Sequence, residues 1–280
     1  ETEPRGVYCG AIGYIGPKGN AVFNVAIRTP VVFRDGTGEM GIGSGVVYDS
    51  EADKEYDECL LKLKFLTDPP KNFELIETLL HQPGEGYVLR ERHLQRLASS
   101  AHFFHFPYDA VAVIAALDGV VRGREGERLR VRLLLAEDGR VSVTSTPMPA
   151  QAPDLVMRYV VSDTRLSAAN PFLYHKTTRR EVYDTEWQAA HDSRGADEVI
   201  YLNEHGELAE GSRTNIFIEK DGRLLTPPLD AGLLPGTLRA ELLASGKAVE
   251  SRLTLDDLER ADAVFLGNSV RGLVRAEPVG

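Results

Sequence analysis

Lys176 lies at the junction between an apolar run, PFLY at 171–174, and TTRREVYDTEWQAA at 177–190, which we expect to be helical. A lysine in this position can be a solvated surface charge, a phosphate ligand or a catalytic amine. An amine acts as a nucleophile only after it gives up its proton, and partial burial favours that loss. The apolar approach to Lys176 would supply such burial, although most lysines are solvated.

Three further segments carry groups that a phosphorylated aldehyde cofactor would need. A carboxylate at Glu210, before the strand-like run NIFIEK, could keep a pyridine nitrogen protonated, which makes the ring an electron sink. The helix start in DAGLLPGTLRAE offers free N–H groups and the positive end of the helix dipole to a phosphate. Arg96, in HLQRLASSA, could add a guanidinium. Each feature alone also fits a strand end, a helix cap or a solvated charge.

The bulk composition restricts the class of protein. The chain has 280 residues, 42% of them hydrophobic and 26% charged, which is typical of a globular protein with a substantial core. Its net charge of −10 argues against a nucleic-acid partner. It contains no apolar run of the length that spans a membrane, and its first residues, ETEPRGVYCGAIGY, lack the basic flank and apolar core expected of a signal peptide. Two cysteines, Cys9 and Cys59, form no disulfide framework, so we expect a cytoplasmic protein with reduced thiols.

The order of expected elements indicates an α+β fold. Residues 7–66 contain the strand-like runs VYCGAIGYI, AVFNVAIRT and GSGVVYDS and then a helix, EADKEYDECLLKLKFL. The segment TDPPK at 67–71 predicts a linker. Further along, YVLRERHLQRLASSAHFFHF has helical spacing, and a hairpin is expected across Asp138-Gly139. Strands separated by turns at His205-Gly206 and Asp221-Gly222 then precede a helix from Pro235 to Gly246.

Taken together, these features resemble the class IV, or fold-type IV, pyridoxal-phosphate enzymes. That family contains the branched-chain and D-amino-acid aminotransferases and aminodeoxychorismate lyase. The resemblance covers residues 72–279, and its most specific part runs from the Glu-Gly pair at 210–211 through Asn-Ile-Phe to the Leu-Pro-Gly helix start. It rests on FELIETLL, HLQRLASSAHFFHFP, HKTTRR, ELAEGSRTNIFI, LLTPPLDAGLLPGTLR and VFLGNSVRGL.

The resemblance implies a two-domain fold of the D-amino-acid aminotransferase type, with a small domain at 72–165 and a large cofactor-binding domain at 166–280. It implies that Lys176 carries the cofactor, pyridoxal 5'-phosphate, and that Glu210 faces the pyridine nitrogen. It also implies a homodimer. The residues expected to hold the phosphate are Arg96, Gly236, Thr237, Leu238, Asn268 and Ser269.

The residues after Lys176 favour a lyase over an aminotransferase. Thr177 next to the lysine and Arg180 four residues after it are typical of the lyases. Aminotransferases more often have a tyrosine five residues after the lysine, where this chain has Glu181. Tyr183 is a candidate to replace that tyrosine as partner of the cofactor's phenolic oxygen, and Arg180 and Tyr183 are candidate substrate contacts. Fold and cofactor site alone do not separate the two activities.

The N-terminal 66 residues resemble the C-terminal end of chorismate-utilising synthases, component I of aminodeoxychorismate and anthranilate synthases. In that family the arginine of IRT, here Arg28, and the glycines of the GxG motif contact chorismate, and two glutamates three residues apart bind Mg²⁺. Because the resemblance covers only the last part of a synthase domain, we expect no synthase activity from this segment by itself. The matching residues are Tyr8, Arg28, Gly43, Gly45, Glu55 and Glu58.

Three hypotheses follow for the whole chain. The first is a lyase that releases 4-aminobenzoate and pyruvate for folate synthesis, fused to a synthase segment whose full-length form would use a glutamine amidotransferase subunit. The second is an aminotransferase for small D- or branched-chain amino acids. The third is a non-catalytic partner that binds chorismate-like anions through Arg28 and its neighbours.

Overall fold

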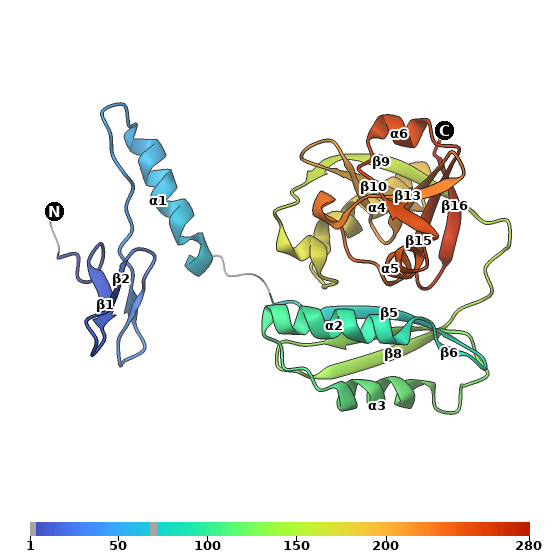
Figure 1. The fold of residues 1–280 in the computed structure, drawn as a ribbon, viewed down its shortest axis with the longest axis horizontal. Coiled ribbons are helices and arrows are strands. Elements are labelled where there is room, and N and C mark those ends of the chain that lie inside the picture. The colour runs from blue at the N-terminus through green and yellow to red at the C-terminus, as the bar shows by residue number, and fades with distance from the viewer. Residues whose placement is uncertain (1–3, 68–71) are drawn as a thin grey trace. The chain divides into compact units, whose positions relative to one another are not determined.

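A computed structural model describes residues 4–67 and 72–280 of the chain. By internal contacts the chain separates into two compact units, Glu1–Lys71 and Asn72–Gly280 (Figure 1). The predicted linker at 67–71 begins at Thr67, the last residue of a helix, and its residues 68–71 lie outside the described residues. None of the helices in the described ranges has the length and apolarity that a bilayer span requires.

The first unit contains short antiparallel strand pairs and a helix. Strand β1 pairs with β2, and β3 pairs with β4. The predicted strand at 43–50 is wrong. Within the described residues this segment forms no β-ladder with another strand, and its Val46, Val47 and Tyr48 are exposed. The elements are β1 (Ala11–Ile15), β2 (Ala21–Val25), β3 (Val31–Val32), β4 (Gly38–Glu39) and α1 (Ala52–Thr67).

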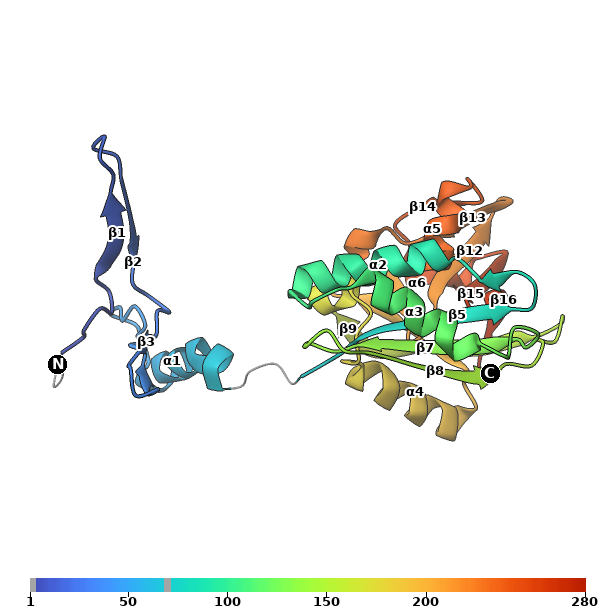
Figure 2. The same cartoon turned by 90° about the horizontal axis from the view of Figure 1, so that it is seen from below.

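The second unit begins with a four-stranded sheet in the order β6-β5-β7-β8. Alternate residues of LRVRLLL face a core that they share with two helices, which lie on one side of the sheet (Figure 2). Arg130 and Arg132 therefore lie on the opposite face of the sheet. The hairpin predicted across Asp138-Gly139 is confirmed. The elements are β5 (Leu75–Gln82), β6 (Gly86–Tyr87), α2 (Arg90–Phe104), α3 (Ala110–Val121), β7 (Leu129–Leu135) and β8 (Val141–Pro147).

An eight-stranded mixed sheet follows, in the order β11-β10-β9-β16-β15-β12-β13-β14. Because β9 starts at Val156 and pairs with both β10 and β16, we place the boundary between the two domains before β9, earlier than the predicted position after residue 165. The strands are β9 (Val156–Leu166), β10 (Glu198–Asn203), β11 (Leu208–Gly211), β12 (Asn215–Lys220), β13 (Arg223–Thr226), β14 (Ala248–Glu250), β15 (Ala263–Asn268) and β16 (Gly272–Pro278).

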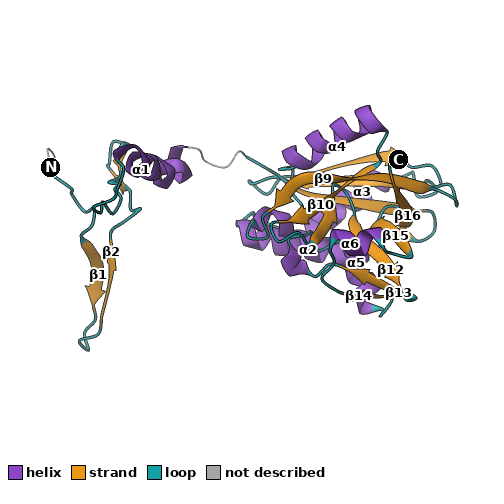
Figure 3. Cartoon of the chain, turned by 90° about the horizontal axis from the view of Figure 1, so that it is seen from above, coloured by secondary structure: helices purple, strands orange, loops and turns teal. Residues whose placement is uncertain are grey.

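Helices cover both faces of this larger sheet (Figure 3). Val199 and Tyr201 pack toward α4, whereas Ile200 and Leu202 belong to the core that includes Leu258 of α6, as expected for residues that alternate along a strand. The mixture of helices and strands makes the fold α+β, as predicted. The helical elements are η1 (Pro171–Tyr174), α4 (Glu181–Arg194), η2 (Leu229–Ala231), α5 (Thr237–Ala244) and α6 (Leu255–Glu259).

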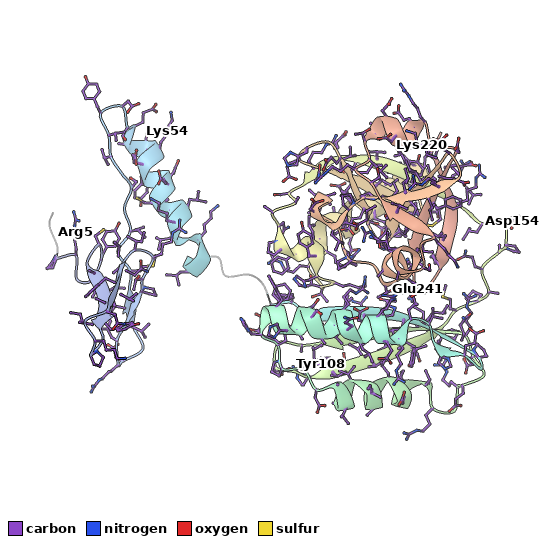
Figure 4. The ribbon with its side chains drawn as sticks, viewed as in Figure 1. Arg5, Lys54, Tyr108, Asp154, Lys220 and Glu241 are labelled. Atoms are coloured by element: carbon purple, nitrogen blue, oxygen red, sulfur yellow. The ribbon has the colours of Figure 1, made fainter. Side chains whose placement is uncertain are left out.

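Local sequence explains where several of these elements begin and end. Asp109 precedes helix α3, and its carboxylate accepts hydrogen bonds from the free N–H groups of Val111 and Ala112 in the first turn. Helix α4 ends at Gly195, which adopts the left-handed conformation with φ of 66°. Arg92 of α2 donates a 2.8 Å hydrogen bond to Glu241 of α5, so this contact joins the two helices. Glu241 is labelled in Figure 4.

Candidate active site

A cavity of about 1130 Å³ lies within residues 72–280. Its wall includes the exposed face of β7, the segment around Lys176, the end of β11, the start of α5 and the turn between β15 and β16. The structure therefore brings together groups that lie far apart in the sequence. The predicted site residues that line the cavity are Arg96, Lys176, Arg180, Tyr183, Glu210, Gly236, Thr237, Asn268 and Ser269.

Backbone hydrogen bonds hold Lys176 in place. The Lys176 carbonyl accepts from the amide of Ile76 at 2.9 Å, and Thr178 exchanges hydrogen bonds with Glu74. The segment is thus tied to the start of β5. Burial lowers the pKa of Lys176 to about 7, and the nearby positive charges of Arg180 and Arg96 act in the same direction. A large fraction of this amine is therefore neutral near pH 7, as a nucleophile requires.

Glu210 lies on β11 and is 6% exposed. Its Oε1 accepts a hydrogen bond of 2.7 Å from the Tyr183 hydroxyl, and its Oε2 accepts one of 2.9 Å from the Leu234 amide. Burial raises the pKa of Glu210 to about 7, although these two hydrogen bonds oppose that shift. Burial and the Glu210 carboxylate raise the pKa of Tyr183, so its phenol stays protonated.

The start of α5 forms another part of the wall. Gly236 precedes the first helical turn, and a Cβ at this position would collide with the side chain of Asn215. Thr237 is buried in the cavity wall, and its hydroxyl lies 3.3 Å from Nε2 of His93. Leu238 does not line the cavity, and its side chain lies next to Gly267. Its predicted contribution through the backbone N–H stays a prediction.

Arg96 reaches the same region from α2. Its Nε and Nη2 donate to both carboxylate oxygens of Glu77, at 2.8 and 2.6 Å, and its Nη1 donates to the Pro235 carbonyl at 3.1 Å. A guanidinium has five N–H groups, so two remain for a ligand. Because Pro235 directly precedes Gly236, Arg96 also fixes the start of α5 relative to α2.

The sequence interpretation missed two buried members of this cluster, Glu77 and His93. His93 donates or accepts at both ring nitrogens, with Glu77 at 2.6 Å on one side and Ser269 at 2.9 Å on the other. The spacing of His93 and Arg96 was a usable signal, since residues three apart share one face of a helix. Glu77, a charged residue inside the apolar strand LIETLL, was another.

Asn268 ends β15 on the cavity side, and Ser269 follows it in the turn. The Asn268 side chain donates to the Arg213 carbonyl at 3.2 Å and accepts from the amides of Val270 and Arg271 at 3.0 Å. It therefore fixes the turn that presents Ser269. Arg180 donates to the Ser212 carbonyl on the neighbouring loop. These contacts stabilise this part of the wall. The phosphate-binding roles predicted for Asn268 and Ser269 stay predictions.

The residues predicted from the synthase resemblance lie in the first unit. Arg28 is exposed and adopts a left-handed φ of 52°. The Tyr8 ring packs on the GxG segment, because a Cβ on Gly43 would lie 2.7 Å from the Tyr8 hydroxyl. Glu55 accepts from Ser50 at 2.6 Å, and Glu58 pairs with Lys62 at 2.7 Å. Among the described residues, no three acidic, histidine or cysteine side chains converge to hold a metal ion. Gly45 has open space around it.

The cavity residues fit pyridoxal phosphate as cofactor. An amine, Lys176, and a buried carboxylate, Glu210, interact electrostatically inside one cavity. The helix start at Gly236 has no room for a side chain, so its backbone remains accessible, and Thr237 and Ser269 add hydroxyl groups. Free N–H groups at a helix start and nearby hydroxyl groups are hydrogen-bond donors that a phosphate anion can accept from.

Comparisons with known proteins agree with this geometry. Residues 74–278 match the family described as amino-transferase class IV, and residues 1–68 match the family described as chorismate binding enzyme. A Schizosaccharomyces pombe protein named "Putative aminodeoxychorismate lyase" is 31% identical over 204 residues, 70% of this chain and 86% of that protein. Anthranilate synthase component 1 of Lactococcus lactis is 47% identical over 66 residues, 24% of this chain and only 14% of that protein.

A solved structure also resembles the second unit. It is titled "Putative amino-acid aminotransferase", from Mesorhizobium loti, and matches with a TM-score of 0.70 and 43% sequence identity. The match covers 74% of this chain and all of that one. The family match spans most of the chain and includes every cavity residue discussed above. The chain therefore belongs to the class IV amino-transferases, and its residues 1–68 are similar to part of the chorismate binding enzymes.

Proposed function

We propose that the chain is a pyridoxal-phosphate-dependent lyase that converts 4-amino-4-deoxychorismate into 4-aminobenzoate and pyruvate. The observation that carries this proposal is the charge of the cavity wall, where arginines outnumber carboxylates. The proposed substrate has two carboxylates, so it would meet this excess of positive charge. The wall's arginines are Arg96, Arg130, Arg132, Arg179, Arg180, Arg213 and Arg271, and its carboxylates are Asp184, Asp197, Glu198 and Glu210.

Some of these arginines are paired, as Arg96 is with Glu77 and Arg180 with Asp184, but the two on β7 are not neutralised in this way. Arg130 and Arg132 form no ion pair among the described residues, and both lie on the cavity face of β7. Burial lowers the pKa of the Arg213 guanidinium, and repulsion from Arg180 and Arg130 contributes to that shift. Like charges that face one another across a cavity favour an anionic ligand with more than one negative group. A branched-chain side chain would instead need an apolar wall.

The chain's residues have defined tasks in this proposal. When bound, pyridoxal phosphate supplies an electron sink for the carbanion at the reacting carbon. Lys176 would hold the cofactor and, as an amine with a pKa of about 7, could accept the proton of the substrate carbon. The C–O bond to the enolpyruvyl group would then break, and that group would take up a proton and leave as pyruvate. Glu210 keeps a proton at the ring nitrogen. Arg130 and Arg132 orient the substrate carboxylates.

One observation favours an aminotransferase as the second candidate. The solved structure from Mesorhizobium loti, which is 43% identical, has a title that names an amino-acid aminotransferase. An arginine-lined cavity also suits 2-oxoglutarate, which has two carboxylates. The second candidate therefore uses the same wall for a dicarboxylate amino acceptor.

A pair of assays on the purified protein loaded with pyridoxal phosphate tests the proposal. The first supplies 4-amino-4-deoxychorismate and measures 4-aminobenzoate and pyruvate. The second supplies D- or L-amino acids with 2-oxoglutarate and measures glutamate. We expect product only in the first assay. Rapid amino transfer without 4-aminobenzoate release would replace the lyase by the aminotransferase.

A further inference from the structure

A buried chain of hydrogen bonds links β5 to the two hydroxyls on the cavity wall. It runs from Glu77 of β5 through His93 of α2 to Ser269 and Thr237. The distances are 2.6 Å from His93 Nδ1 to Glu77 Oε2, 2.9 Å from Nε2 to Ser269 Oγ and 3.3 Å from Nε2 to Thr237 Oγ1. Glu77 is 2% exposed and His93 is 1% exposed, so the chain is shielded from solvent.

Glu77 is ionised in this environment. Burial by itself would raise the pKa of Glu77, but the charge of Arg96 and hydrogen bonds from Arg96 and His93 lower it to about 2. An ionised carboxylate only accepts hydrogen bonds. His93 Nδ1 must therefore carry the proton and donate it, and the carboxylate fixes both the tautomer and the orientation of the ring.

The fixed ring leaves Nε2 facing the two hydroxyls. Ser269 lies in the turn after β15, and Thr237 is the first residue of α5, so one nitrogen joins two separate parts of the wall. The contact with His93 therefore sets the orientation of each hydroxyl relative to the cavity. Glu77 also accepts from Arg96, which contacts the residue before Gly236. One carboxylate thus controls the position of three groups around the start of α5.

We propose that Glu77 and His93 are positioning residues for the phosphate of the cofactor. They do not touch it, but they hold the Ser269 and Thr237 hydroxyls and the Arg96 guanidinium in the arrangement that binds it. This inference rests on the assignment of pyridoxal phosphate to the cavity and not on the choice between lyase and aminotransferase. It assigns a task to two buried titratable residues that the reaction itself does not use.

The test measures binding and not turnover. Apoprotein variants are titrated with pyridoxal phosphate and, separately, with inorganic phosphate, and melting temperatures are recorded without ligand. We expect His93→Leu to weaken binding of both ligands by about 10- to 100-fold, the effect of losing hydrogen bonds that organise a charged site. His93→Gln, whose amide oxygen can accept from the hydroxyls in the place of Nε2, should restore most of the affinity.

His81 provides the matched control. It is a second buried histidine of the same domain, on β5, 5% exposed, and its Nδ1 lies 3.2 Å from the Glu127 carbonyl, away from the cavity wall. We expect His81→Leu to lower the melting temperature while phosphate affinity stays unchanged. If His81→Leu and His93→Leu weaken phosphate binding equally, the effect is general destabilisation and the positioning role is wrong.

Glu77→Gln is the second variant, and it keeps the shape of the side chain. It should weaken phosphate binding even if His93→Leu does not fold, because Arg96 and His93 then lose their charged partner. Unchanged affinity in Glu77→Gln would overturn the inference. The effects of His93→Leu and Ser269→Ala on phosphate affinity should be less than additive in the double variant, because His93 acts partly through the Ser269 hydroxyl; full additivity would contradict the inference.

The outcomes separate this inference from the proposed function. Wild-type protein that binds pyridoxal phosphate but transfers amino groups would remove the lyase and leave the positioning role intact. Wild-type protein that binds neither ligand would overturn both. Normal lyase turnover with unchanged phosphate affinity in both Glu77→Gln and His93→Leu would overturn the positioning role alone.

Discussion

The Tyr183 hydroxyl donates a 2.7 Å hydrogen bond to Oε1 of Glu210, the carboxylate proposed to face the cofactor's ring nitrogen. From its position in the sequence, Tyr183 was a candidate partner for the phenolic oxygen instead. In the structure its hydroxyl supports Glu210, together with the Leu234 amide on the other carboxylate oxygen. These two hydrogen bonds within the protein therefore orient both oxygens of the carboxylate.

We predict that Glu210→Gln retains the cofactor but slows turnover by about 10²- to 10⁴-fold, as is typical when one proton-managing group is lost. A neutral amide no longer holds a proton at the ring nitrogen. Steady-state rates at saturating cofactor measure the effect. Glu204→Gln, an exposed carboxylate outside the cavity wall, is the control. A wild-type rate in Glu210→Gln would place the essential carboxylate elsewhere.

Lys176→Ala should abolish turnover and the covalent attachment of the cofactor, while the fold is retained. The reason is that Lys176 is proposed both to hold the cofactor and to move the substrate proton. Mass spectrometry after borohydride reduction and circular dichroism check the two halves of this prediction. Lys247→Ala, a substitution of an exposed lysine, should behave as wild type. Cofactor still attached in Lys176→Ala would identify a different lysine.

The reactivity of Lys176 in the apoprotein should depend on pH with a midpoint near its pKa of about 7. Because burial and positive neighbours lower this pKa from 10.5, the amine is charged below the midpoint and neutral above it. Acylation of Lys176, followed by peptide mass spectrometry, should therefore rise through neutral pH. Removing one neighbouring charge in Arg180→Gln should move the midpoint upward. A midpoint near about 10, as in a solvated lysine, would contradict the burial argument.

The double substitution Arg130→Gln with Arg132→Gln should raise KM for a dicarboxylate substrate by about 10-fold, equivalent to about 1.4 kcal/mol, with a much smaller effect on kcat. Both side chains face the cavity from β7 without an ion-pair partner among the described residues. Initial-rate kinetics measure the change. Arg223→Gln, on an exposed residue of β13, is the control. An unchanged KM would exclude these arginines from substrate binding.

Glu55→Ala with Glu58→Ala should leave turnover in the second unit unchanged, and the intact chain should not consume chorismate with Mg²⁺ and ammonia. Mg²⁺ requires several oxygen ligands in octahedral order, whereas these two carboxylates are engaged by Ser50 and Lys62. Chorismate is followed by its absorbance. Its steady disappearance, lost in the double variant, would show that the N-terminal segment is an active site.

Features encoded by neighbouring residues could be predicted from the sequence. The hairpin at Asp138-Gly139 follows from turn chemistry next to alternating apolar residues, and the helix after Gly236 follows from its start and stop signals. Lys176 and Glu210 were identified through motifs whose residues are close together in the chain. The prediction of a strand at 43–50 was wrong because a strand also needs a neighbouring strand to pair with, and the residues of the segment itself do not specify one.

The tertiary structure alone decided which of these residues act together. His93 and Ser269 are 176 positions apart and Glu77 precedes His93 by 16, so no local pattern connects them. Likewise, alternation along β7 predicts that Arg130 and Arg132 share a face, but only the fold determines that this face borders the cavity. The pKa of Lys176 also depends on the tertiary structure. Burial and the charges of Arg180 and Arg96 set it, and both depend on segments brought together by long-range packing.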